Sequence, residues 1–381
     1  MKAIVNVNIV LPDKVINNGV IIFDEEINNI ISIEDLSSYE NVDIINGEGG
    51  YVTPGFIDIH IHGAGGYDTM EGTEEALSNI SNTIIKTGVT HFLPTTMTME
   101  SKAIKNALDN IINCRNKEME GAQILGANVE GPFISPEYKG AQAEKNIKKP
   151  DMEFFNDYLE YIKIITVAPE IEGGLEFIKT ARDKGIIVSA GHSGATYEDL
   201  IKARKYGLQH ATHLFNAMTG LHHRKPGIVG AVLSSDMSCE LIADNIHINP
   251  AVLKLVTKTK ALDEIILITD SMEAAGLDEG EYSLGGQKVI VKDEAARLEN
   301  GALAGSILTL NKAVINMLKA STLPLEKVIN MVTLNPACLL NIADKIGSLK
   351  PGLQANISLF DSKFNVRKVF IRGKEKYSAR R

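Results

Sequence analysis

The chain has 381 residues, of which 44% are hydrophobic and 23% charged, and its mean hydropathy is close to zero. Its 39 basic and 48 acidic residues leave a formal net charge of −9, which argues against a broad basic surface for binding nucleic acid. No apolar run approaches the ~20 residues that a membrane-spanning helix needs, and asparagines interrupt the apolar start where a signal peptide would be continuous. We therefore expect a cytoplasmic protein with neither a nucleic-acid nor a membrane partner.

The three cysteines, Cys114, Cys239 and Cys338, lie far apart and form no Cys-x-x-Cys pair. An odd number of scattered cysteines argues against a disulfide framework and against a thiolate metal site. We expect all three to be buried thiols.

Short β-branched runs separated by turn residues fill the first fifty positions. They predict strands at residues 4–10, 19–23, 27–33 and 42–45. From residue 53 onward, apolar strand-like runs alternate with segments of helical periodicity, a pattern typical of parallel strands joined by crossover helices. Eight such strands are predicted, at residues 55–62, 91–95, 124–130, 164–168, 186–191, 211–215, 240–245 and 265–270.

Amphipathic segments between these strands predict an outer ring of helices, among them residues 74–86, 101–113, 175–184 and 197–205. Residues 273–300 resemble an insertion with hairpin character, and two further helices are expected at 307–319 and 325–341. Turns and β-branched residues return from residue 347. Because eight is the closed-barrel number, the sequence predicts an α/β fold: a (β/α)8 TIM-like barrel at residues 53–346, beside a small β-domain formed by both chain ends, residues 1–52 and 347–381.

The first barrel strand carries Asp58, His60 and His62 at alternate positions, so their side chains share one face. Two imidazoles at the carboxyl end of a barrel strand can direct their nitrogens at one cation, and that end is where barrel active sites lie. The alternative is a pair of histidines that only form hydrogen bonds in a polar barrel mouth.

Other strands also end in residues that bind metals. In the sixth strand, parity places His213 toward the barrel interior and turns His210 away, so we interpret His210 as structural. The residues of ligand type at strand ends are His60, His62, Glu130, His192, His213 and Asp270.

Neutral imidazoles and carboxylates suit a borderline divalent cation, with zinc or iron favoured. A bridging Glu130 would let His60 and His62 hold one cation, and His192 and His213 a second. A cation of this kind activates water, and an aspartate beside that water can transfer its proton to a leaving nitrogen. The set therefore predicts metal-assisted hydrolysis of an amide-like bond.

The motifs at residues 54–63 and 347–356 resemble those of the amidohydrolase superfamily. Within it, the chain is similar along its whole length to the N-acetylglucosamine-6-phosphate deacetylases. The segments that carry this narrower resemblance are residues 130–133, 191–193, 212–218, 224–227, 243–247, 269–270 and 303–306.

This resemblance implies that Glu130, His192 and His213 bind the principal metal and that Asp270 is the general acid/base. Relatives with Gln-x-Asn in place of His-x-His use one metal; this chain keeps both histidines, so one or two divalent ions per subunit are expected. The implied activity is removal of the acetyl group from an amino-sugar phosphate in a homodimer. The implied substrate contacts are Ala141, Gln142, Asn216, Ala217, Arg224, His247, Leu303, Ala304 and Gly305.

Arg224 and His247 form a sensible pair for a phosphate, in a site that a neighbouring subunit completes in this family. The alternative for Arg224 is a surface salt bridge. Gln142 stands where some relatives carry histidine, so its contact with the sugar stays open. Two other functions also stay open: action on the galactosamine epimer or another N-acyl amino-sugar phosphate, and a metal-free scaffold on the same barrel.

Overall fold

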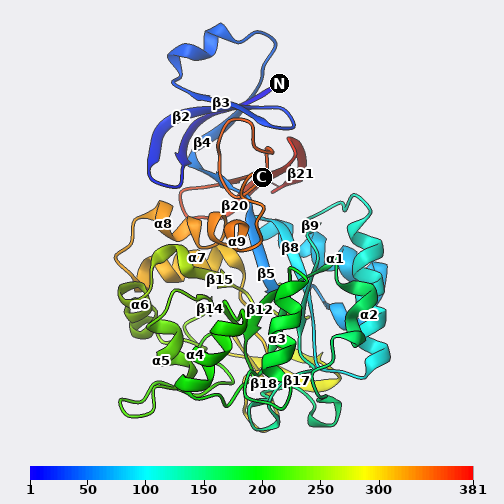
Figure 1. Ribbon diagram of the computed structural model, residues 1–381. Helices are drawn as coiled ribbons and strands as arrows, with labels where there is room; N and C mark the ends of the chain where they lie inside the picture. Colours follow the sequence, from blue (N-terminus) through cyan, green and yellow to red (C-terminus); the bar gives the residue numbers. More distant parts are fainter. Residues whose placement is uncertain (381) are drawn as a thin grey trace.

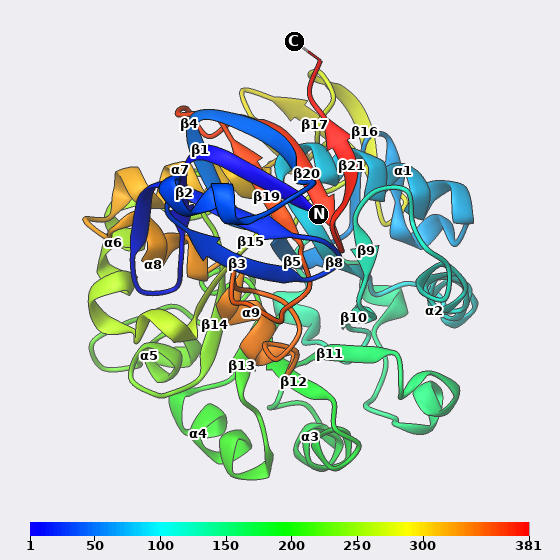
Figure 2. The ribbon, with the colours of Figure 1, turned by 90° about the horizontal axis from the view of Figure 1, so that it is seen from above.

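The computed structural model describes residues 1–380. Its centre is a ring of eight parallel strands that pair in chain order, each beside the next (Figures 1 and 2). The prediction of a (β/α)8 barrel is confirmed. The strands are β5 (Phe56–Ile61), β8 (Val89–Thr96), β10 (Ala127–Glu130), β11 (Ile162–Val167), β12 (Ile187–Ala190), β13 (His210–Ala211), β14 (Ser238–Ile242) and β15 (Ile265–Ile268). A short β9 (Gln123–Ile124) also pairs with β8.

The ring closes where β15 meets β5. At the carboxyl end, the amide of Asp270 donates to the carbonyl of His60 at 2.9 Å. At the amino end the two strands bond instead to a helical connection, because Leu267 N donates to Met331 O and Ile57 N donates to Val332 O. The barrel is thus closed directly on one side of the seam and through an inserted turn on the other.

That turn interrupts the helix expected at residues 325–341, so this prediction is wrong in one respect. The segment forms α8 (Leu325–Asn330) and α9 (Leu334–Leu339). Pro336 has no amide hydrogen, and its ring would clash with the carbonyl of Val332 in a continuous helix. The break frees this carbonyl for the amide of Ile57.

Within residues 1–380, seven further α-helices are present, and Figure 2 shows them around the barrel. In α1, the Thr73 side chain accepts a hydrogen bond from the amide of Ala76 and caps the helix, while Leu77, Ile80 and Ile84 are buried against the barrel. The four ring helices expected by range are found close to their predicted limits. The helices are α1 (Glu74–Ile84), α2 (Ser101–Arg115), α3 (Gly174–Asp183), α4 (Tyr197–Tyr206), α5 (Gly227–Leu233), α6 (Pro250–Thr259) and α7 (Leu310–Ala320).

Both ends of the chain enter one seven-stranded sheet of order β21-β20-β19-β4-β1-β2-β3, above the barrel in Figure 1. β4 lies between β1, its parallel neighbour, and β19, its antiparallel neighbour, and only one residue separates it from β5. The expected boundary after residue 52 falls within β4 and stays a prediction. The strands are β1 (Lys2–Val10), β2 (Val15–Phe23), β3 (Ile27–Ile31), β4 (Asp43–Pro54), β19 (Ile357–Phe360), β20 (Val366–Ile371) and β21 (Lys374–Ser378).

The expected hairpin insertion forms a three-stranded antiparallel sheet at the end of the barrel remote from the chain termini (Figure 1). Its strands are β16 (Gly280–Leu284), β17 (Gln287–Lys292) and β18 (Ala295–Leu298). A smaller ribbon of β6 (Gly63–Ala64) and β7 (Tyr67–Asp68) follows β5.

Two of the three cysteines are buried as expected, Cys114 and Cys239. Cys338 is exposed, which corrects the prediction; it lies in the short α9, next to the buried Ala337 that faces the core. Within residues 1–380, no helix combines the length and the apolar character that crossing a bilayer requires.

Candidate active site

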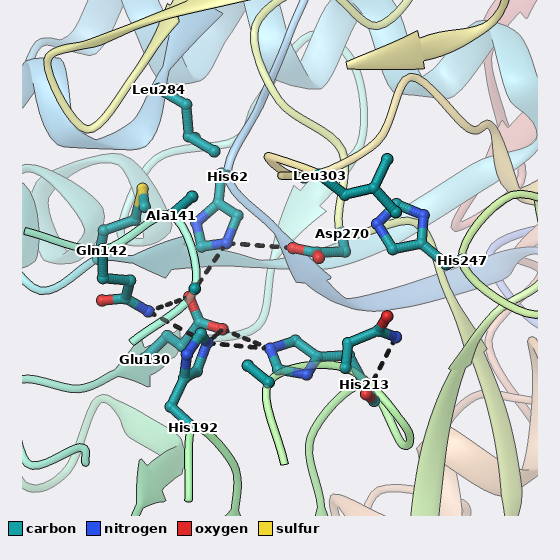
Figure 3. Close-up of a pocket in the computed structure, with 15 residues that line it drawn as sticks. His62, Glu130, Ala141, Gln142, His192, His213, His247, Asp270, Leu284 and Leu303 are labelled. Carbon is teal, nitrogen blue, oxygen red and sulfur yellow. Dashed lines mark hydrogen bonds and ion pairs between the residues drawn. The ribbon is translucent and has the colours of Figure 1, made fainter. Parts of the chain in front are cut away.

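The six side chains of ligand type converge at the carboxyl ends of the barrel strands, and Figure 3 shows five of them, His62, Glu130, His192, His213 and Asp270. They form two neighbouring sets of three. One set, which we call the glutamate group, consists of Glu130, His192 and His213. The other, the aspartate group, consists of His60, His62 and Asp270.

The glutamate group is the tighter of the two. Glu130 Oε1 lies 3.0 Å from His192 Nε2 and 2.9 Å from His213 Nε2, and the two nitrogens are 3.2 Å apart. Three different strand ends supply these residues, so the barrel itself fixes their approach. Potential ligand atoms therefore point at a common centre.

In the aspartate group, Asp270 Oδ1 lies 3.4 Å from His60 Nε2 and 3.2 Å from His62 Nε2. Glu130 is also close, with its two oxygens 3.6 Å and 3.3 Å from these same nitrogens. The bridging position expected for Glu130 is consistent with these distances. Asp270 adds a carboxylate that the expected ligand set of the His-x-His pair did not contain.

Hydrogen bonds behind the imidazoles set their tautomers. Nδ1 of His62 donates to the Thr95 carbonyl at 3.2 Å, and Nδ1 of His192 donates to the Tyr138 carbonyl at 3.0 Å. With the hydrogen on Nδ1, the lone pair of each Nε2 is directed into the site, the arrangement that metal-binding histidines use. His60 Nε2 is buried and has no hydrogen-bond partner among residues 1–380. This orphaned atom and the convergent lone pairs fit a divalent cation.

The charges in the site influence one another strongly. Burial would raise the pKa of Glu130, but His192, His213 and His62 hold it well below its ordinary value. Burial likewise opposes protonation of His60, yet the carboxylates of Glu240, Asp270 and Glu130 raise its pKa to about 9. The surrounding imidazoles therefore favour the ionised form of the Glu130 carboxylate.

Glu240, on β14, is the functional residue that the sequence analysis missed. Its side chain is fully buried, and Oε2 accepts from His60 Nδ1 at 2.9 Å and from the His213 amide at 3.0 Å. Oε1 lies 3.3 Å from His210 Nε2. Glu240 therefore touches one member of each group. The sequence did contain a signal for this residue. A carboxylate within an apolar strand is buried, and a buried carboxylate needs a partner.

The parity argument for the sixth strand is wrong. β13 ends at Ala211, so His213 lies in a turn beyond the strand, with φ of 28°. His210 is buried and bonds to Glu240 and Ser238, so it does not turn away from the interior. It belongs to neither ligand group, in keeping with a structural role.

Three residues of the two groups have left-handed backbone. Positive φ values occur at His192 (48°), His213 (28°) and Asp270 (48°). Non-glycine residues adopt this conformation at a cost of about 1–3 kcal/mol each, and such strain gathers at functional sites. Side-chain alternation along a strand cannot predict these turns.

The ligand groups open into a pocket of about 220 Å³. Met97 and Leu284 give it apolar walls, and His247 lies at one side (Figure 3). The expected substrate contacts that line it are Ala141, Gln142, Asn216, Ala217, His247, Leu303 and Gly305.

Two expected contacts lie elsewhere. Arg224 is exposed on a loop, where its Nη1 donates to His223 Nε2. Ala304 is buried in a small apolar cluster beneath the insertion, because its side chain points away from the pocket that its neighbours line.

Gln142 contacts the glutamate group directly. Its Oε1 accepts from the Thr98 amide at 2.7 Å, and this bond turns Nε2 toward Glu130 Oε2 at 2.9 Å and His192 Nε2 at 3.3 Å. The carboxamide thus helps to hold Glu130.

Comparison with known proteins agrees with this geometry. The model of the amidohydrolase family matches residues 51–376. The chain belongs to the amidohydrolase family. The resemblance found in the sequence is thereby confirmed. The residue sets that could hold a metal lie at the carboxyl ends of the barrel strands, where barrel enzymes have their active sites.

Individual relatives show which enzymes of the family the chain is similar to. The chain is 41% identical over 327 residues to an N-acetylglucosamine-6-phosphate deacetylase from Lysinibacillus sphaericus, covering 84% of each chain. It is 36% identical to an N-acetylgalactosamine-6-phosphate deacetylase from Escherichia coli O157:H7, covering 84% of this chain and 86% of the relative. The crystal structure of N-acetylglucosamine-6-phosphate deacetylase from Pasteurella multocida superposes with a TM-score of 0.94 at 32% identity, over 99% and 100% of the two chains.

Proposed function

We propose that this amidohydrolase removes the acetyl group of N-acetylglucosamine 6-phosphate, giving glucosamine 6-phosphate and acetate. The observation that carries the proposal is the convergence of Glu130, His192 and His213 beside Asp270, at the floor of a pocket. The relatives from several organisms support the choice of substrate.

The glutamate group would hold the principal divalent cation, zinc or iron, and the aspartate group offers a place for a second. A bound cation of this kind acts as a Lewis acid that polarises a carbonyl and lowers the pKa of water. The oriented Nε2 atoms of His192 and His62 suit such an ion because their Nδ1 hydrogens are already engaged.

Asp270 is the proposed general acid/base. It lines the pocket, and although burial raises its pKa, the interactions with His60, His62 and His213 outweigh burial and lower it. An ionised carboxylate can take a proton from the attacking water and return it to the amide nitrogen as the C–N bond breaks. Water thus adds to the acetyl carbon, and the sugar leaves with a neutral amine.

His247 is the proposed phosphate contact within the chain. Its Nδ1 bonds to Asp244 Oδ2 at 2.6 Å, which leaves Nε2 for a substrate at the pocket wall. Arg224 lies outside this pocket, so its proposed contact with phosphate requires a second copy of the chain. A homodimer and a cytoplasmic location stay predictions, and light scattering on the purified protein measures the first.

The galactosamine epimer is the rival substrate, favoured by the similarity to the Escherichia coli O157:H7 relative. Steady-state assays on both N-acetylhexosamine 6-phosphates separate the two functions. We expect the higher kcat/KM for the gluco compound. A much higher value for the galacto compound would replace the proposal with its rival.

The metal-free scaffold is tested by elemental analysis. We expect close to one or two equivalents of a transition metal, because the donor set is complete. Less than about a tenth of an equivalent, with no uptake on reconstitution, would instead favour the scaffold.

A further inference from the structure

A second cavity, of about 390 Å³, lies on the opposite side of the molecule from the catalytic pocket, where the amino ends of β8 and β11 meet the segment after α9. We call it the basic cavity. Its polar lining consists of His91, Arg115, Gln123, Lys163, Lys345 and Gln354. No carboxylate is among its lining residues. This is unexpected in a chain whose net charge is −9.

The three cations of this cavity have no ion-pair partner within residues 1–380, whereas those of the adjoining cavity do. That neighbour shares His91 and Gln123 with it. There, Arg372 pairs with Glu25 at 2.7 Å and Lys374 pairs with Glu118 at 3.2 Å. The chain therefore neutralises basic side chains in one cavity and leaves them unpaired in the next.

Two of the cations are held close together. Arg115 Nε donates to the Leu125 carbonyl at 3.1 Å, and its guanidinium lies over the Tyr161 ring at 5.5 Å. These contacts fix the group, and its two terminal nitrogens have no partner in the described part of the chain. Lys163 Nζ donates to the Glu160 carbonyl at 2.9 Å, and burial and the charge of Arg115 lower the pKa of Lys163 more than the Glu160 carboxylate raises it. The mutual repulsion of these side chains is a cost that a bound anion would remove.

The rest of the lining offers a hydrogen bond and an apolar surface. His91 is 6% exposed; its Nδ1 bonds to Thr90 Oγ1, and Nε2 has no partner among the described residues. Ile124, Leu125 and Ile342 contribute apolar surface to the same cavity. One part of the cavity therefore presents positive charges, and another part presents an apolar surface that suits a ring or an alkyl chain of a ligand.

We propose that the basic cavity is a second ligand site, separate from the catalytic pocket, and that it binds an organic phosphate. The phosphate lies among Arg115, Lys163 and Lys345, because a dianion satisfies several cations at once and a guanidinium binds phosphate oxygens in pairs. The organic part contacts Leu125 and Ile342. This proposal does not depend on the reaction assigned to the catalytic pocket.

The test is isothermal titration calorimetry of the full chain with three probes: inorganic phosphate, glucose 6-phosphate and adenosine monophosphate. Wild type is compared with Arg115→Gln/Lys163→Gln. The matched control, Lys179→Gln/Lys202→Gln, removes the same charge from exposed positions on α3 and α4. Circular dichroism and Tm establish that both variants are folded.

We expect at least one organic probe to bind wild type and control with the same Kd, and the cavity variant to bind it at least tenfold more weakly. Any binding in the catalytic pocket persists in all three proteins and so does not produce this difference. The proposal is overturned if neither organic probe binds wild type at millimolar concentration. It is equally overturned if the cavity variant binds as tightly as the control.

Discussion

The two ends of the barrel differ in how their charged side chains are paired. At the carboxyl end, four imidazoles face three carboxylates, and the contacts between the two kinds of group are no longer than 3.6 Å. At the amino end, Arg115, Lys163 and Lys345 surround a larger cavity with no carboxylate. The first end is organised by its own residues to hold a cation. The cavity at the second end has no negatively charged side chain in its lining, so a bound anion has to supply the opposite charge.

The largest expected effect concerns Asp270. Asp270→Asn keeps the shape of the side chain but removes its capacity to transfer a proton, so kcat falls by about 10²–10⁴-fold. Elemental analysis should still find the equivalent of metal that the glutamate group holds, because that group is intact. Near-normal turnover would exclude the proton-transfer role.

Glu240→Gln tests how the carboxyl end of the barrel is organised to hold a cation. The variant retains the shape but removes the negative charge behind His60, so we expect metal affinity to fall by about 10–100-fold. The readout is competition with a chromophoric chelator, together with the increase in Tm that metal produces. His210→Gln, which alters only the third partner of Glu240, serves as control. An equal loss of Tm in metal-free and metal-loaded Glu240→Gln, with unchanged affinity, would contradict a positioning role.

Arg224→Ala tests whether a second copy contributes to the site. Because Arg224 is exposed and outside its own pocket, an effect on phosphate binding has to come from a partner subunit. We expect KM for the phosphorylated substrate to rise about tenfold with kcat little changed. A variant with unchanged KM in a protein that is dimeric by light scattering would place the phosphate elsewhere.

The smallest effect lies at the amino end. Burial lowers the pKa of His91 from 6.5 to about 4, so between these values the unfolded chain binds more protons than the folded one. This contribution is complete above the unfolded pKa and is lost as pH falls toward the folded pKa. Between pH 7 and 5.5 it should reduce the free energy of unfolding by about 1 kcal/mol. Urea unfolding of wild type and His91→Gln should show this difference, and parallel pH curves would contradict it.

The convergence of the glutamate and aspartate groups could be predicted from the sequence because each member stands at or just after the end of an apolar run, where a parallel barrel brings strand ends together. His192 and Glu130 are examples: neither conclusion needed more than strand position and residue type. The pairing of both chain ends in one sheet was likewise readable from their β-branched runs.

What could not be predicted depends on backbone that leaves regular structure, or on distant contacts. Side-chain alternation did not predict the turn at His213, because a strand of two residues does not fix the parity of the residues that follow it. Glu240 was hidden because its partners come from β5 and from the turn after β13, far away in the sequence. Arg224 matched a motif, yet only the fold reveals that its loop is directed away from the pocket.

The position of β4 has a consequence for synthesis of the chain. β4 continues into β5, which carries His60 and His62, but its neighbour β19 is made only about three hundred residues later. On the ribosome, the edge of β4 that β19 will cover stays open to other strands while the residues between them are made. The strand that leads directly into the histidine strand therefore gains its second neighbour only when β19 is made.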